Sequence, residues 1–262
     1  MAAPAPHTVP MTATVLVEKR RGIVFVTINR PEKRNAMDPA TMEALAAAAD
    51  DVDADPDARV MVLTGAGTAF SSGMDLQAFS QGDRSRPAGR SRFPAVPAAK
   101  PAIAAVNGPA VAGGFELVLA CDLAVAAESA SFGLSEVQRG LFAAGGGAFR
   151  LPRIAGPRLA MEVLLTGDRI DARRALEYGI VNQVVPAAEV LTRAEELASR
   201  IAAAAPLGVA ETVTLARRAF DLPEEELWRL NGDARGRVFS SEDALEGARA
   251  FVEKRMPRWT GR

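Results

Sequence analysis

The sequence predicts an α/β fold with a mostly parallel sheet, followed by a helical C-terminal part. In the first part of the chain, strand-like segments alternate with helical segments. The strand-like segments are either apolar throughout or alternate between apolar and polar residues. Beyond about residue 160 nearly every segment reads as a helix. With 262 residues and 48% hydrophobic content, the chain can bury a substantial core.

The N-terminal elements begin with a predicted β-hairpin. Residues 14–29 alternate apolar and polar side chains on either side of Gly22, which is typical of two strands joined by a tight turn. A proline-containing loop follows. Asp38 and Pro39 then provide an N-cap and a first-turn proline, so a helix is predicted over 41–55.

The alternation continues along the chain. A short buried strand is predicted over 59–67, a strand over 101–108, a helix over 113–122 and a strand over 123–133. Further helices are predicted over residues 158–167, 171–179, 189–205, 208–220 and 242–255. Three regions follow from this pattern: a disordered tail over 1–13, an α/β core over 14–200 and a helical region over 201–262.

Composition excludes several classes of protein. There are 31 basic and 32 acidic residues, so the net charge of −1 gives no global field that would attract nucleic acid or an anionic membrane. The single cysteine, Cys121, excludes an internal disulfide and a cysteine-based zinc site, and no other metal site is expected. The single histidine, His7, lies in the Pro/Ala-rich tail, so serine–histidine and cysteine–histidine mechanisms lack a base.

Location follows from similar arguments. The first residues lack the basic and apolar regions of a signal peptide, and no window reaches the roughly 18 uninterrupted apolar residues of a membrane span. With one cysteine, the sequence fits a cytoplasmic protein. The segment over 77–100 is polar and too long for an ordinary connection, so it is either a functional lid or disordered.

Two glycine-containing stretches can place backbone N–H donors around an anion. One is the turn over 67–76, which follows a strand and leads toward a helix. The other contains Gly113 and Gly114 at the start of a predicted helix, where N–H groups are free and the helix dipole favours negative charge. Glu116 lies in that same first turn. From the residues alone, Glu116 has either a structural partner or a chemical role.

A second carboxylate, Glu136, follows the strand predicted over 123–133 and precedes a glycine-rich stretch over 145–147. The separation from Glu116 leaves room for a helix, a strand and a return, so both carboxylates can face one cavity. A loop glutamate is otherwise commonly a solvated surface charge, and the spacing permits the pair without requiring it.

Taken in order, these three stretches resemble those of the crotonase, or enoyl-CoA hydratase/isomerase, superfamily, most closely a bacterial enoyl-CoA hydratase. The resemblance spans almost the whole chain, from INRPEKRNAMD through TGDRIDARRALEYGIVNQVV to the closing FVEKR. It implies a ClpP-like spiral of repeated β-β-α units with a C-terminal helical trimerisation region. It also implies addition of water across the 2,3 double bond of a 2-trans-enoyl-CoA in fatty-acid or related acyl-CoA degradation.

The resemblance also implies roles for individual residues. Glu116 and Glu136 match the two catalytic glutamates, with Glu116 activating water and Glu136 delivering a proton. The backbone N–H groups of Met74 and Gly113 match the oxyanion hole for the thioester carbonyl. Coenzyme A, which is part of the substrate and not a separate cofactor, is expected at a further set of positions: Lys33, Arg34, Ala36, Ser72, Asp75, Lys254 and Arg255.

Assembly and reaction type are also expectations of the resemblance. A homotrimer or a hexamer made of two trimers is expected, without nucleic-acid or membrane partners. The alternatives are isomerisation of an enoyl-CoA, dehydration of a specialised hydroxyacyl-CoA, or a non-catalytic acyl-CoA-binding or RNA-binding relative. Both glutamates favour hydration, and the acidic helix over 41–55 disfavours RNA binding. Ser135 and the stretch over 140–153 depart from the common hydratase pattern, which leaves the acyl-chain preference open.

Overall fold

The computed structural model describes residues 13–82 and 99–262. The predicted N-terminal tail and most of the segment over 77–100 lie outside these residues, so both expectations stay predictions. Within the described chain, the strands are β1 Val15–Arg20, β2 Ile23–Ile28, β3 Val60–Gly65, β4 Ala102–Val106, β5 Ala110–Val111, β6 Leu123–Ala127, β7 Ser131–Gly133, β8 Ile170–Asp171 and β9 Gln183–Val185.

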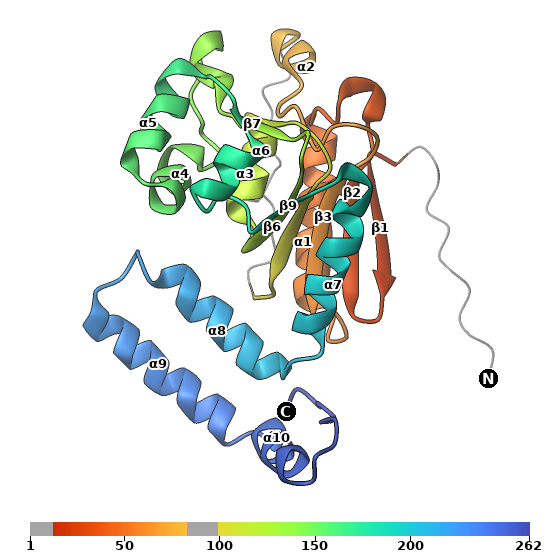
Figure 1. The fold of residues 1–262 in the computed structure, drawn as a ribbon, viewed down its shortest axis with the longest axis vertical. Helices are drawn as coiled ribbons and strands as arrows, with labels where there is room; N and C mark the ends of the chain where they lie inside the picture. The colour runs from red at the N-terminus through yellow and green to blue at the C-terminus, as the bar shows by residue number, and fades with distance from the viewer. Residues whose placement is uncertain (1–12, 83–98) are drawn as a thin grey trace, which may run out of the picture.

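Helices surround these strands and form the whole C-terminal part of the molecule (Figure 1). The α-helices are α1 Pro39–Ala54, α2 Leu76–Ser80, α3 Gly113–Ala120, α4 Gly147–Ala155, α5 Pro157–Thr166, α6 Ala172–Glu177, α7 Val190–Ala202, α8 Pro206–Arg218, α9 Glu224–Phe239 and α10 Glu242–Val252. Short 3-10 helices are η1 Pro31–Lys33, η2 Ser135–Arg139 and η3 Ala187–Glu189.

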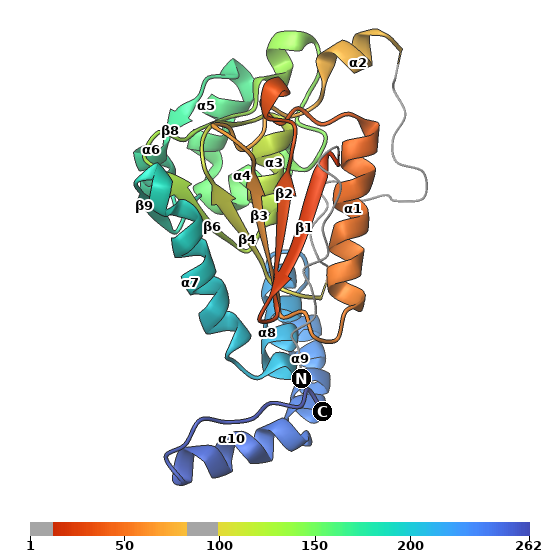
Figure 2. The same ribbon diagram turned by 90° about the vertical axis from the view of Figure 1, so that its right-hand side faces the viewer.

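The larger sheet has the strand order β1-β2-β3-β4-β6-β9. Strands β1 and β2 form the predicted antiparallel hairpin, and every later pairing in this sheet is parallel. Strands β3 and β4 are buried along their whole length, as expected for parallel strands covered on both faces. Helix α1 packs against β1 and β2, and α7 packs against β3, β4 and β6, on either side of the sheet in Figure 2.

A smaller sheet has the strand order β5-β7-β8, and the chain visits it repeatedly after leaving the larger sheet. Strand β4 in the large sheet is followed by β5 in the small sheet and then by α3. Strand β6 is likewise followed by β7 in the small sheet, then by η2 and α4. These successive β-β-α units confirm the predicted spiral.

Several elements differ from the sequence prediction. Strand β5 was not predicted, and strands β8 and β9 form within the part predicted to be almost entirely helical, where β9 pairs with β6 at the edge of the large sheet. The strand predicted over 123–133 is two strands in different sheets, because the Ala130 N–H bonds the Ala127 carbonyl at 2.9 Å and turns the chain. Helix α4 was not predicted; it begins at a glycine and contains Pro152, both poor for local helix propensity, and is held by packing on α3 and α5. Helix α9 was also missed, since two internal glycines weaken its local signal.

Helices α8, α9 and α10 extend away from the sheets in both views (Figures 1 and 2). Arg217 of α8 joins these helices to the core through a bidentate ion pair with Asp122, in which both N–O distances are 2.7 Å. Helix α7 spans the predicted boundary at residue 200 and packs on the sheet, and that boundary stays a prediction. No helix within the described ranges is long and apolar enough to span a bilayer.

Candidate active site

Parallel pairing of β5 with β7 brings the two predicted catalytic segments to one edge. The pairs Ala110–Phe132 and Val111–Gly133 align these strands in register. The chain leaves parallel strands at the same edge, so α3, which begins after β5, and η2, which begins after β7, start side by side. Glu116 is in the first turn of α3, and Glu136 is in the first turn of η2.

The N–H groups of Met74 and Gly113 also meet here. Met37 bonds the Gly73 carbonyl at 2.7 Å and the Asp75 N–H at 2.9 Å, so the Met74 N–H points to the opposite side of its strand. That side faces α3, because a Cβ built on Gly113 would lie 3.7 Å from Met74 N. The Gly113 N–H belongs to the first turn of α3, where intrahelical acceptors are lacking. The two predicted oxyanion donors therefore lie next to each other.

Ala112 holds the Gly113 N–H in place through an unusual backbone conformation. Its φ of 51° and ψ of −127° lie in a region that residues with a Cβ rarely adopt. Its N–H donates to the Gly133 carbonyl at 2.8 Å, which ties this strained residue to the end of β7. Strain of this kind persists where neighbouring structure imposes it and is concentrated at functional sites.

Glu116 is buried, with 4% of its surface exposed. Its Oε1 accepts a hydrogen bond from the Gly147 N–H at 2.9 Å. Burial raises the pKa of Glu116, and the N–H groups of Gly147 and Gly145 together with the charge of Arg150 oppose this only in part. The glycine-rich stretch over 145–147 thus runs against Glu116.

Glu136 is less buried but has fewer partners. Its Oε2 is inaccessible to solvent and has no hydrogen-bond partner among the described residues. Burial raises the pKa of Glu136 to about 7, its own backbone N–H lowers it, and the Glu116 charge adds to the increase. Glu136 can therefore hold a proton near neutral pH while Glu116 accepts hydrogen bonds from backbone N–H groups. This difference in environment suits one group to donate a proton and the other to accept one.

The residues predicted to contact coenzyme A from the N-terminal half lie close together. The Ser72 N–H donates to the Arg34 carbonyl at 3.0 Å, and Lys33 Nζ lies 3.3 Å from Asp75 Oδ2. The Ala36 carbonyl already accepts a hydrogen bond from Arg30. Lys33 and Arg34 are exposed, so they can reach a ligand.

Asp75 has structural bonds that the sequence did not indicate. It is 6% exposed and is the N-cap of α2, where it accepts from the N–H groups of Gln77 and Ala78. Burial raises the pKa of Asp75, but hydrogen bonds from Ala78 and Lys33 outweigh it, so the pKa is lowered. Its side chain is therefore bound within the protein.

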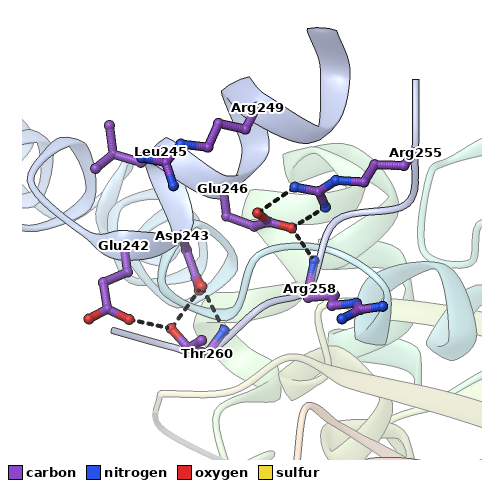
Figure 3. Close-up of a pocket in the computed structure, with 8 residues that line it drawn as sticks. All are labelled: Glu242, Asp243, Leu245, Glu246, Arg249, Arg255, Arg258 and Thr260. Atoms are coloured by element: carbon purple, nitrogen blue, oxygen red, sulfur yellow. Dashed lines mark hydrogen bonds and ion pairs between the residues drawn. The ribbon is translucent and has the colours of Figure 1, made fainter. Parts of the chain in front are cut away.

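Lys254 and Arg255 lie far from that cluster, just after α10 and at the opposite end of the molecule from α2 (Figure 1). Arg255 lines a cavity of about 620 Å³ on α10. Its Nη1 and Nη2 donate to Oε1 and Oε2 of Glu246, at 2.6 and 2.9 Å (Figure 3). Within one chain, the structure does not bring these residues to the carboxylates.

Two supporting residues were missed from the sequence. Arg30 is 8% exposed; it donates to the Ala36 carbonyl at 2.6 Å and pairs with Asp38 and Asp75 at 3.1 and 3.2 Å. Asn35 is fully buried and bonds the carbonyls of Ala66 and Ala69. Together they fix the loops on both sides of Met74. The sequence carried no local signal for these contacts, because Arg30 and Asn35 bond residues that lie 31 to 45 positions further along the chain.

The described residues contain no group of three or more histidine, cysteine, aspartate or glutamate side chains arranged to hold a metal ion.

Comparisons with known proteins identify the family to which this chain belongs. Residues 18–262 match the family described as Enoyl-CoA hydratase/isomerase. Enoyl-CoA hydratase EchA19 of Mycobacterium tuberculosis is 44% identical over 264 residues, covering 97% of this chain and 99% of that protein. The carnitinyl-CoA dehydratase of Salmonella typhi is 40% identical, covering 96% of this chain and 100% of that protein.

Solved structures show the same likeness. The crystal structure of an enoyl-CoA hydratase from Mycobacterium tuberculosis H37Rv superposes with a TM-score of 0.91 at 44% identity, covering 95% of this chain and 99% of that one. The crystal structure of enoyl-CoA hydratase EchA1 from Mycobacterium marinum also has a TM-score of 0.91, at 46% identity, with the same coverage of 95% and 99%.

Proposed function

Because this chain belongs to the enoyl-CoA hydratase/isomerase family, we propose that it is an enoyl-CoA hydratase that adds water across the 2,3 double bond of a 2-trans-enoyl-CoA. The product is a 3-hydroxyacyl-CoA, and the reaction belongs to fatty-acid or related acyl-CoA degradation. The single observation that carries the proposal is the pair of carboxylates with different environments beside two adjacent N–H donors.

In this mechanism, the N–H groups of Met74 and Gly113 bind the thioester oxygen. Negative charge develops on that oxygen as the oxygen of water adds to C3, and each such donor is typically worth about 10²–10³ in rate. Glu116 accepts the proton of the water, and Glu136 gives a proton to C2. The raised pKa of Glu136, about 7, supports its role as the acid.

The direct test is hydration of crotonyl-CoA, followed by the loss of absorbance of the conjugated enoyl thioester. Wild-type protein should remove the absorbance, and Glu116→Gln, E136Q and the double variant should do so much more slowly. A wild-type protein that bound crotonyl-CoA without hydrating it would instead identify a non-catalytic acyl-CoA-binding relative.

The substrate range needs a wider panel. Crotonyl-CoA, longer and branched 2-enoyl-CoAs, a 3-enoyl-CoA and carnitinyl-CoA separate hydration, isomerisation and dehydration of a specialised hydroxyacyl-CoA. The retention of both glutamates favours hydration. Isomerisation of the 3-enoyl-CoA without hydration of any 2-enoyl-CoA would replace the proposal with an isomerase.

We also propose that the chain assembles as a trimer, or as a hexamer of two trimers. Large apolar side chains on and beside α8, α9 and α10 support this, since Phe220, Phe239 and Phe251 are 79%, 72% and 84% exposed in the single chain. Light scattering coupled to gel filtration should give a mass of three or six chains. A monomer mass at micromolar concentration would contradict this assembly.

The reaction as proposed needs no cofactor beyond the coenzyme A of its substrate, because proton transfer and two N–H donors supply the chemistry. Activity that persists after treatment with a metal chelator is the expected result. A cytoplasmic location is proposed from the single cysteine, Cys121, which has no internal partner for a disulfide.

A further inference from the structure

The loop over 145–147 is the direct support of Glu116. The Gly147 N–H lies 2.9 Å from Glu116 Oε1, and the Gly145 N–H acts on the same carboxylate. Gly146, between them, has a φ of 110°, which the loop can adopt because this residue lacks a Cβ. The position of the carboxylate thus depends on what holds this loop.

Arg150, in the first turns of α4, holds it. Its Nη1 donates to the Gly145 carbonyl at 3.0 Å. The guanidinium fills the space that a Cβ on Gly146 would occupy, so the side chain folds back over the loop. It also lies over the ring of Phe149, at 5.2 Å from the ring centroid. Arg150 is half-buried, and these contacts restrict its position.

Arg150 also supplies positive charge to Glu116. Helix α3 packs against β4, β5 and α4, and the two strands carry no ionisable side chain. The positive charge of Arg150, on α4, lowers the pKa of Glu116. It also lowers the pKa of Cys121 at the end of α3. From η2, the facing group is Glu136. The two carboxylates therefore differ in their access to a cation.

We propose that Arg150 is a positioning residue that fixes Glu116, and not Glu136, as the carboxylate that accepts the proton of water. It does so by clamping the loop over 145–147 onto Glu116. Its positive charge also acts on that carboxylate. The inference rests on the proposed hydratase function and deepens it, because it explains how two glutamates in one site take different roles.

The proton balance shows why the assignment matters. Water loses one proton to the Glu116 carboxylate as its oxygen bonds to C3. The electrons of the C2–C3 double bond move through the thioester enolate and take the proton of the Glu136 carboxylic acid at C2. Glu116 ends protonated and Glu136 ionised, and one proton returns from the first to the second through solvent before the next turnover. An enzyme that starts with Glu116 protonated cannot begin this sequence.

The test compares R150Q, R150K and R153Q with wild type. Arg153 is the matched control, because it lies on the same helix and also faces the Phe149 ring, at 5.8 Å, but pairs with Asp221 at 2.6 Å. The first readout is the pH dependence of kcat/KM for crotonyl-CoA. The second is the infrared band of the protonated Glu116 carboxyl, identified by its absence in E116Q and titrated without substrate.

In R150Q, kcat should fall by about 10- to 100-fold, the loss typical when a residue that orients a metal ligand is replaced, since Arg150 likewise acts through the group that it orients. The acid limb of kcat/KM and the titration midpoint of the Glu116 band should both move to higher pH. R150K keeps the charge and should retain both midpoints while losing part of kcat. R153Q should match wild type in all of these. Thermal unfolding checks each variant, and R150M, which keeps the aliphatic stem, replaces R150Q if that variant does not fold.

A loss of activity that is equal at every pH, with an unchanged Glu116 band, would overturn the proposal and leave Arg150 with a structural role. The infrared readout keeps this distinct from failure of the proposed function. A wild-type protein inactive on the enoyl-CoA panel refutes the hydratase, whereas a Glu116 midpoint that is the same in wild type and R150Q refutes the role of Arg150.

Discussion

The backbone N–H of Gly147 donates to Oε1 of Glu116 across 2.9 Å, although the two residues are 31 positions apart in the chain. This bond joins helix α3 to the first residue of α4 and holds a buried carboxylate in one orientation. Glu136 has no equivalent bond at its buried Oε2. One carboxylate is thus held by backbone donors, whereas the buried Oε2 of the other has no hydrogen-bond partner among the described residues.

Glu116→Gln and Glu136→Gln should each lower kcat for crotonyl-CoA by at least the roughly 10²–10⁴ typical of a lost general acid or base. Glutamine keeps the shape of the side chain but cannot transfer the proton, so substrate binding should survive. The double variant should lose much less than the product of the single losses, since both groups act on one water and one substrate. Full hydratase activity in E116Q would contradict the two-carboxylate mechanism.

The pH dependence of kcat/KM should be bell-shaped. Glu136 must be protonated to act as the acid, so the basic limb should fall near the pKa of about 7 that burial and the Glu116 charge give it. Glu116 must be ionised, so it sets the acid limb, above the usual range for a glutamate. The residual activity of E136Q should lack the basic limb. A basic limb unchanged in that variant would assign the ionisation to another group.

Glu136→Gln should stabilise the protein in alkaline solution. Because the folded-state pKa of about 7 is above the ordinary value of 4.5, the stability contributed by protonation is present below the ordinary value and is lost as pH rises through about 7. At pH above this range, removal of the half-buried charge should raise the free energy of unfolding by on the order of 1 kcal/mol. Chemical denaturation of wild type and E136Q in acidic and in alkaline buffer measures this difference in the free energy of unfolding. An equal difference in both buffers would contradict the raised pKa of Glu136.

Gly113→Ala and Gly114→Ala should fail in different ways. A Cβ on Gly113 would lie 3.3 Å from the flexible end of Met37, so the fold should tolerate it, and 3.7 Å from Met74 N, so the methyl group would lie beside the predicted oxyanion donors. Because the thioester oxygen is proposed to bind beside these two N–H groups, a methyl group there would weaken its hydrogen bonds, and we expect kcat to fall by up to the roughly 10²–10³ of a lost donor, with a nearly unchanged Tm. A Cβ on Gly114 would collide with the Ser71 carbonyl, so this variant should lose thermal stability. Equal loss of Tm in both would argue against a donor role for Gly113.

The double variant K254A/R255A should raise KM for crotonyl-CoA by roughly fivefold, with kcat nearly unchanged, if these side chains meet coenzyme A phosphates across a subunit interface. The increase should shrink at high salt, where exposed charges are screened. Gel filtration shows whether assembly is intact, because Arg255 also pairs with Glu246. An unchanged KM at low salt would identify both as ordinary surface charges.

The sequence by itself determined the α/β class, the N-terminal hairpin, most of the α-helices and the residue types of the site. The pattern around Gly22 predicted the hairpin, and Asp38 with Pro39 predicted the start of α1, because turns and helix caps depend on neighbouring residues. Gly113 and Glu116 share one helical turn, so their proximity was also a local property. The family resemblance then indicated Glu136 and Met74, and their roles remain predictions.

Only the tertiary structure decided how these groups meet. The pairing of β5 with β7, the bond from Gly147 to Glu116 and the strained Ala112 all join segments that are distant in sequence. Asp75, expected at coenzyme A, caps α2, and α4 forms despite Pro152 because it packs on its neighbours. The pKa values of Glu116 and Glu136 also depend on the tertiary structure. Burial and the surrounding charges set them, and both depend on how distant parts of the chain pack together.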